Sequence, residues 1–105
     1  NQTCHQLPAE EDEFEYAGVE KQTSTLVTPY RVKQALVSFE CRLNQIVDLG
    51  HEPMAGHLVL GDVVAIHVRD DAVNDFKIDS EKLDAIGRMA GNDYSLTRDK
   101  IQLNR

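Results

Sequence analysis

The feature that most constrains the fold is a pair of long apolar runs separated by a short connection rich in glycine and proline. The runs are ALVSFECRLNQIVDL, residues 35–49, and HLVLGDVVAIHV, residues 57–68, and GHEPMAG joins them. The second run is apolar at most positions, as expected for a strand buried on both faces. Two long strands joined by a short loop predict an antiparallel hairpin. Gly61, inside the second run, indicates a bulge, a bend or a close backbone approach.

Apolar and polar residues alternate in the first of these runs, which predicts a strand with one buried side and one wet or ligand-facing side. The set expected to be buried is Val37, Phe39, Cys41 and Leu43, and the opposite set is Ser38, Glu40, Arg42 and Asn44. Cys41 belongs to the apolar set, so we expect it in the core. With only two cysteines, Cys4 and Cys41, the sequence favours a reduced pair over a disulfide.

Shorter elements are expected on either side of the hairpin. Residues 10–18, EEDEFEYAG, predict a short helix with acidic residues in its first turn and Gly18 just after its end. Residues 19–32 contain Pro29 and predict an edge strand or an extended connection. Residues 78–87, IDSEKLDAIG, predict a second helix with Asp79 or Ser80 as N-cap, an apolar stripe of Leu83 and Ile86, and an end at Gly87. The remaining tail shows no helical or strand period.

Length and charge limit the class of protein. The chain has 105 residues, a net charge of −7, 41% hydrophobic and 28% charged residues, which predicts one soluble globular domain over residues 1–105. Its basic residues are scattered among eighteen acidic ones, which argues against nucleic acid as a partner. The most apolar run is too short and too interrupted to cross a membrane. With no signal-peptide pattern, a cytoplasmic location is expected.

Two long strands cannot close a sheet by themselves. An isolated hairpin is marginal in water, and a barrel needs more strands than this chain offers. We therefore expect either further strands from a longer parent chain or a second copy of this chain, and we predict an obligate homodimer built on the two runs.

Three segments taken in order resemble one family. SFECRL, HLVLGDVVAIHV and LDAIGRMAGNDYSLTRDKIQL are similar, in order and spacing, to the C-terminal half of the flavin reductase-like, FMN-binding split-barrel proteins, which include relatives of nitrilotriacetate monooxygenase component B. The resemblance extends from about residue 10 to residue 103. It implies a mainly β fold with short helices, part of a split β-barrel completed by dimerisation. It also implies FMN as cofactor, NAD(P)H as co-substrate and, in many members, a partner oxygenase.

The resemblance assigns roles to five residues. A loop with Arg88, Met89, Gly91 and Tyr94 packs close to the flavin, with Arg88 offering charge to a phosphate and Tyr94 covering an aromatic face. His57 is the candidate catalytic residue, placed beside the flavin and the nicotinamide. Each has a plainer alternative: Tyr94 anchors the tail, Arg88 makes a surface ion pair, and His57 faces water at the end of a strand.

The histidines show no metal-ligand spacing. His67 lies ten residues after His57, on the same face of the expected strand but too far along it to share a metal, and His5 and His51 add no suitable offset. We therefore expect no metal site.

Two functions of different class remain open. Family members are typically much longer, and the half that supplies most flavin contacts is expected to lie upstream of this chain. The chain is accordingly a flavin reductase-like NAD(P)H:flavin oxidoreductase, as a fragment or a truncated form, or it is a non-catalytic dimeric module that binds a small molecule or a protein. We expect the chain alone to bind FMN weakly or not at all, and any residual affinity to depend on Tyr94 and Arg88.

Overall fold

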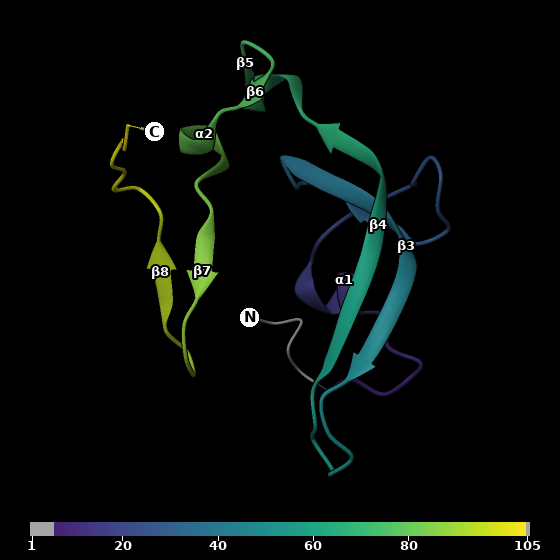
Figure 1. Ribbon diagram of the computed structural model, residues 1–105. Coiled ribbons are helices and arrows are strands. Elements are labelled where there is room, and N and C mark those ends of the chain that lie inside the picture. The colour runs from purple at the N-terminus through teal and green to yellow at the C-terminus, as the bar shows by residue number, and fades with distance from the viewer. Residues whose placement is uncertain (1–5, 105) are drawn as a thin grey trace. The chain divides into compact units, whose positions relative to one another are not determined.

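The computed structural model describes residues 6–104, which form two compact units, residues 6–67 and residues 68–104. The elements of the first unit are α1 Glu13–Ala17, β1 Lys21–Gln22, β2 Arg31–Val32, β3 Val37–Asp48 and β4 His57–Val68, the last of which ends one residue into the second unit. The elements of the second unit are η2 Asp70–Ala72, β5 Val73–Asn74, β6 Lys77–Ile78, α2 Ser80–Leu83, β7 Ile86–Arg88 and β8 Tyr94–Leu96. The strands pair as β1–β2, β3–β4, β5–β6 and β7–β8 (Figure 1). The prediction of a mainly β fold with short helices is confirmed.

Helix α1 ends before Gly18, as the sequence predicts, but it begins at Glu13, three residues later than the predicted span 10–18. The Asp12 carboxylate accepts a hydrogen bond from the Phe14 amide at 2.9 Å and caps the first turn. Gly18 takes the left-handed conformation at φ 67°, and its amide donates to the Glu15 carbonyl at 3.1 Å. The two caps explain why so short a helix has defined ends.

The predicted hairpin of long strands is confirmed. β3 and β4 run in opposite directions beside one another, and residues 49–56 join them (Figure 1). A Cβ atom at Gly61 would lie 3.2 Å from Cys41 Cβ and 3.4 Å from the Arg42 carbonyl oxygen. Gly61 is therefore a point of close backbone approach, one of the three readings predicted for it.

The predicted burial of β3 is wrong. Phe39 and Leu43 are 57% and 64% exposed, and Cys41 is an exposed free thiol, whereas Glu40 is only 1% exposed. The reason is that the loop around Thr25 folds over the polar side of the strand, where the Glu40 carboxylate accepts its amide hydrogens. β4 also differs from expectation, since its large apolar side chains stay partly exposed: Leu58, Val59, Leu60, Val63 and Ile66. Cys4 lies outside the described residues.

The predicted second helix is shorter than expected. α2 begins after Asp79, whose carboxylate caps it, but it ends at Asp84, which adopts φ 43° in the left-handed region. Ile86, expected on the buried stripe of that helix, instead begins β7 and is exposed. The tail that showed no period contains β8, which pairs with β7. Three-residue strands are too short for an alternating pattern to stand out in a sequence.

The β5–β6 hairpin turns through two residues with positive φ. Asp75 and Phe76, at φ 49° and 59°, lie between Asn74 and Lys77, which are paired. This pattern is typical of type I′ turns, where Asn-Gly is preferred. Phe76 is 100% exposed, so it gains no packing from this conformation.

Candidate functional site

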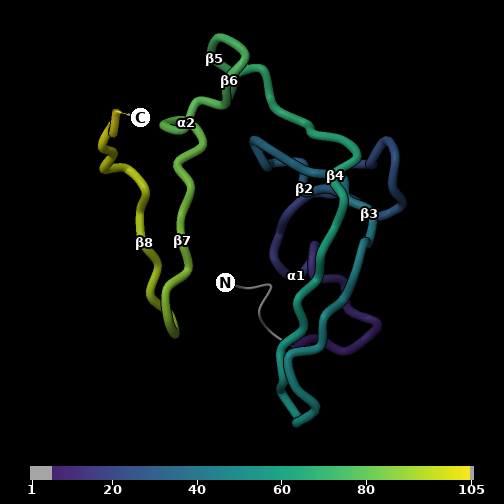
Figure 2. The backbone as a smooth tube through the Cα atoms, in the orientation of Figure 1, coloured from purple at the N-terminus to yellow at the C-terminus, as the bar shows by residue number. Residues whose placement is uncertain are grey.

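Four of the five predicted site residues lie on one hairpin. β7 and β8 lie side by side as a two-stranded antiparallel sheet (Figure 2). Arg88 is opposite Tyr94, and Gly87 is opposite Ser95. Side chains of directly opposed residues project from the same face of a two-stranded ribbon. Arg88 and Tyr94 are thus brought together on one face.

The turn of this hairpin is tight and carries the other two predicted residues. The Met89 amide donates to the Asp93 carbonyl at 3.0 Å, and the Asp93 amide donates to the Ala90 carbonyl at 3.0 Å. Gly91 has φ 56° at the first central position of the turn, as in type II′ turns. A Cβ atom there would meet nothing within 4 Å. The backbone at Gly91 is therefore open to the close approach of a ligand.

The hairpin surface offers both apolar and charged groups. Met89 is 66% exposed and Tyr94 is 39% exposed. An aromatic ring and a guanidinium on one face can hold a planar ligand that carries negative charge, by stacking and by charge-assisted hydrogen bonds. Contact of these residues with flavin stays a prediction.

His57, the fifth predicted residue, belongs to the first unit, at the start of β4. Its Nδ1 lies 2.7 Å from Oδ1 of Asp48, the last residue of β3, and both side chains are exposed. An ionised carboxylate only accepts hydrogen bonds, so Nδ1 carries the proton and the neutral ring keeps Nε2 as an acceptor. Asp48 therefore sets the orientation and the tautomer of the His57 ring. Asp48 was not predicted from the sequence as a site residue. The eight-residue connection, residues 49–56, which brings the end of β3 beside the start of β4, is the signal that could have found Asp48.

The long hairpin carries two further polar pairs between its strands. The Asn44 amide donates to Asp62 at 3.1 Å, and His67 Nε2 is hydrogen-bonded to Glu40 Oε2. The two histidines therefore have separate partners on β3. Within residues 6–104 there is no group of three or more histidine, cysteine or acidic side chains arranged to hold a metal ion.

Glu40 is the most strongly held group of the first unit. Its carboxylate accepts hydrogen bonds from the amides of Thr25 at 2.9 Å, Leu26 at 2.6 Å and Val27 at 3.2 Å. Burial alone would raise the pKa of Glu40, but the amides, together with His67, outweigh it and lower the pKa from 4.5 to about 2. Glu40 was predicted only as a member of the polar side of β3, and its role as an anchor for the loop was missed. Nothing in the local sequence marks this role, since the contacts join residues thirteen or more positions apart.

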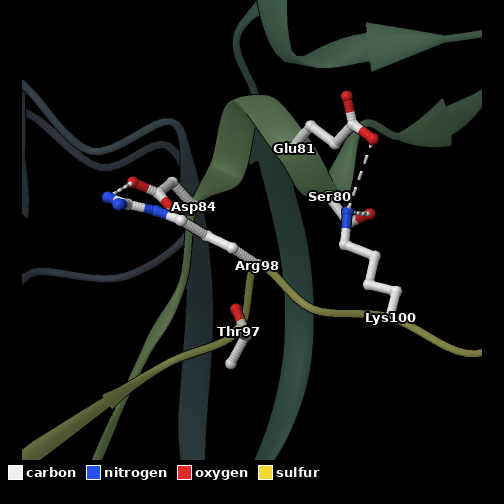
Figure 3. Close-up of a pocket in the computed structure, with 6 residues that line it drawn as sticks. All are labelled: Ser80, Glu81, Asp84, Thr97, Arg98 and Lys100. Atoms are coloured by element: carbon white, nitrogen blue, oxygen red, sulfur yellow. Dashed lines mark hydrogen bonds and ion pairs between the residues drawn. The ribbon is translucent and has the colours of Figure 1, made fainter.

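The second unit has a polar cleft of about 320 Å³ beside α2 (Figure 3). Arg98 binds Asp84 through two hydrogen bonds of 2.9 Å, and Lys100 Nζ donates to Ser80 Oγ at 2.9 Å and lies 4.0 Å from Glu81. The hydrogen bonds from Arg98 lower the pKa of Asp84. Each cation that lines this cleft already has an anionic neighbour. These ion pairs and hydrogen bonds hold residues 97–100 against α2 and its C-cap.

The helices of the described residues are short. None of them, within residues 6–104, is long and apolar enough to cross a membrane.

The family comparison identifies one domain type. The model of the flavin reductase-like domain matches residues 1–83. Curated relatives include uncharacterised proteins of Halalkalibacterium halodurans, 35% identical over 102 residues, and of Aquifex aeolicus, 36% identical over 93 residues. The alignments cover 94% and 88% of this chain but 48% and 45% of those proteins, so the chain spans about half the length of the curated relatives it matches.

Solved structures give the same result. Nitrilotriacetate monooxygenase component B from Bacillus cereus is 31% identical, with a TM-score of 0.88 over 97% of this chain and 52% of that protein. The 2-nitrobenzoate 2-nitroreductase of Pseudomonas fluorescens is 26% identical, with a TM-score of 0.75 over 88% of this chain and 46% of that protein. The third is a structure from Shewanella frigidimarina, named as a flavin reductase with a split barrel domain. It is 24% identical, with a TM-score of 0.78 over 99% of this chain and 52% of that protein, and at this identity it supports the fold alone. The predicted split-barrel fold class and the predicted resemblance are both confirmed, and the chain belongs to the flavin reductase-like domain family.

Proposed function

We propose that this chain supplies part of the flavin site of an FMN-dependent NAD(P)H:flavin oxidoreductase. The observation that carries the proposal is the placement of Arg88 opposite Tyr94 on the β7–β8 hairpin, with Gly91 in its turn. This hairpin lies beyond the residues matched by the family model, yet the Bacillus cereus structure covers 97% of the chain. Family membership and local geometry therefore support the proposal independently.

The residues of the hairpin fit a planar anionic cofactor. Tyr94 stacks on one face of the ring system, Met89 adds a polarisable apolar contact, and Arg88 donates hydrogen bonds to a phosphate or to a ring oxygen. At Gly91 a side chain would be strained at φ 56°, so the backbone stays bare. FMN, when bound, supplies the hydride chemistry that accepts two electrons from NAD(P)H.

His57 is proposed to act on the nicotinamide side of the reaction. Asp48 holds the proton on Nδ1, which leaves Nε2 free to accept a hydrogen bond from a carboxamide or, when protonated, to face negative charge. Because Asp48 acts through His57, it is a positioning residue. Loss of Asp48 is expected to slow the reaction through His57, since the ring loses the hydrogen bond that orients it and sets its tautomer.

A homodimer and a partner oxygenase are proposed as the assembly of the active protein. Exposed apolar side chains on β3 and β4, such as Phe39, Leu43 and Ile66, would be covered in a dimer built on the long hairpin. The name of the Bacillus cereus structure, a monooxygenase component B, suggests the kind of partner.

Titration of FMN, followed by quenching of flavin fluorescence, tests the site. Tyr94→Ala is expected to weaken binding about tenfold and Arg88→Gln about threefold, because one removes the stacked ring and the other an exposed charge. Tyr16→Ala, at an exposed tyrosine of α1, is the matched control and should leave binding unchanged. Oxidation of NADH with loss of flavin absorbance then tests catalysis.

The alternative is a non-catalytic dimeric module that keeps the fold and has lost the cofactor. The partly exposed apolar surface of the long hairpin favours it. Absence of FMN binding by the dimer at millimolar FMN would support this alternative. Binding that both Tyr94→Ala and Arg88→Gln leave unchanged would place the flavin elsewhere.

A further inference from the structure

A cavity of about 380 Å³ lies in the first unit, between the loop that follows β1, strand β2 and the first half of β3. Its walls are mostly apolar and aromatic, with Tyr30 and Phe39 among them, and its polar lining includes Arg31. A cavity of this size is in the range of small-molecule sites, which combine apolar walls with a few polar groups. None of the residues proposed above to contact flavin or nicotinamide lines it.

Arg31 is the unusual member of this lining. Among residues 6–104, its Nε is the one buried side-chain nitrogen or oxygen atom without a hydrogen-bond partner. Within the described part of the chain, its guanidinium makes one hydrogen bond, from NH2 to the Thr23 carbonyl at 3.4 Å, which is a weak contact. Buried donors are nearly always paired, and a guanidinium is always charged. The site therefore lacks an acceptor, and that acceptor should be an anion.

No carboxylate of the described residues neutralises Arg31. Lys33 pairs with Glu20 at 2.5 Å, and Lys21 pairs with Asp12. Glu40 also lines the cavity, but its two oxygens are taken up by three backbone amides and His67. The charge of Arg31 is thus available to a ligand.

We propose that this cavity binds a small organic monoanion, a carboxylate attached to an aromatic or aliphatic group, through the guanidinium of Arg31. A carboxylate matches the two-pronged donor set of arginine, and the apolar walls receive the remainder of the ligand. A single charge is preferred because the cavity holds one cation, because the ionised Glu40 lies in its wall, and because the chain carries a net charge of −7. The proposal does not depend on flavin binding.

Benzoate is the probe for the first experiment, carried out on the 105-residue chain by NMR, with acetate and inorganic phosphate as comparisons. The Nε–H resonance of Arg31 is expected to shift on addition of benzoate, with weaker binding of acetate and none of phosphate. Arg31→Gln is expected to weaken benzoate binding about tenfold or more, because a charge-assisted hydrogen bond is lost. Arg42→Gln, at an exposed arginine of β3 outside the cavity, is the matched control and should leave binding unchanged.

The wild-type spectrum decides the matter even if Arg31→Gln does not fold, since it reports on the Arg31 side chain directly. An Arg31 resonance that does not respond to benzoate would overturn the proposal, and so would phosphate binding at least as tight as benzoate. Displacement of benzoate by FMN would also overturn it, because the cavity would then belong to the flavin site.

Discussion

Each unit of this protein uses one carboxylate to hold a segment distant in sequence, but the two carboxylates differ in burial. Glu40 is buried and holds the loop of residues 25–27 through backbone amides, whereas Asp84 is partly exposed and holds Arg98. Water competes for the exposed pair and screens it, but it cannot replace the carboxylate that the loop amides have bound. The same kind of interaction is therefore expected to be essential in one unit and minor in the other.

The largest effect is expected from Glu40→Gln. The amide keeps the size of the side chain but removes the charge, and its NH2 group faces donors where the carboxylate offered an acceptor. We expect the melting temperature to fall by about 10 °C or more. Thermal unfolding measured by circular dichroism checks this, with Glu52→Gln, at an exposed glutamate, as control. A fall no greater than that of the control would mean that the loop does not depend on Glu40.

Acid should remove the same contribution from the wild-type protein. The pKa of Glu40 is about 2 in the folded chain against an ordinary 4.5, so its stabilising effect is fully present above pH 4.5 and is lost as the pH falls toward 2. The pKa values of Asp12, Asp79 and Asp84 are lowered too, so the informative quantity is the difference between wild type and Glu40→Gln. That difference in urea midpoint should shrink between pH 4.5 and pH 2, and a constant difference would contradict the assignment.

A smaller effect, of opposite sign, is expected at the β5–β6 turn of the second unit. Phe76→Gly removes the strain of a side chain at φ 59° and loses no packing, because Phe76 is fully exposed. The melting temperature should rise by about 3 °C. Phe76→Ala, which keeps a Cβ atom, is the control and should gain less. If both variants raised the melting temperature equally, the destabilising feature of the wild type would be the exposed ring and not the strained backbone.

The smallest effect is expected from Asp84→Asn. The exposed pair with Arg98 is broken, yet the asparagine still tolerates φ 43°. The melting temperature should fall by about 3 °C or less, and 0.5 M salt should reduce the difference. If the loss approached that of Glu40→Gln, burial would not be what separates the two units.

The sequence predicted the elements that depend on local rules. The two long strands follow from periodicity, the end of α1 from the left-handed conformation that Gly18 accepts, and the cap at Asp79 from a side chain that bonds to nearby amides. The resemblance predicted a loop at Arg88 and Tyr94 and the sequence pattern predicted no strand there, because the strands of this hairpin have only three residues each.

The burial of β3 was beyond reach of the sequence. Alternation identifies two faces of a strand, but which face is covered depends on where a distant loop folds. Here the loop amides needed an acceptor, and Glu40 supplied it. Arg31 escaped notice for a related reason, since a missing partner becomes visible only once every neighbour is placed.

The close approach at Gly61 has a consequence for how relatives of this protein can vary. A methyl group at position 61 would lie 3.2 Å from the Cβ atom of Cys41, so the two positions share one small volume. Alanine at position 61 should be tolerated in relatives that have glycine at position 41. A relative should therefore carry a side chain at one of these two positions and glycine at the other. Glycine at both positions is the intermediate that requires no adjustment, since side chains at both positions would require one of them to shift by a few tenths of an ångström.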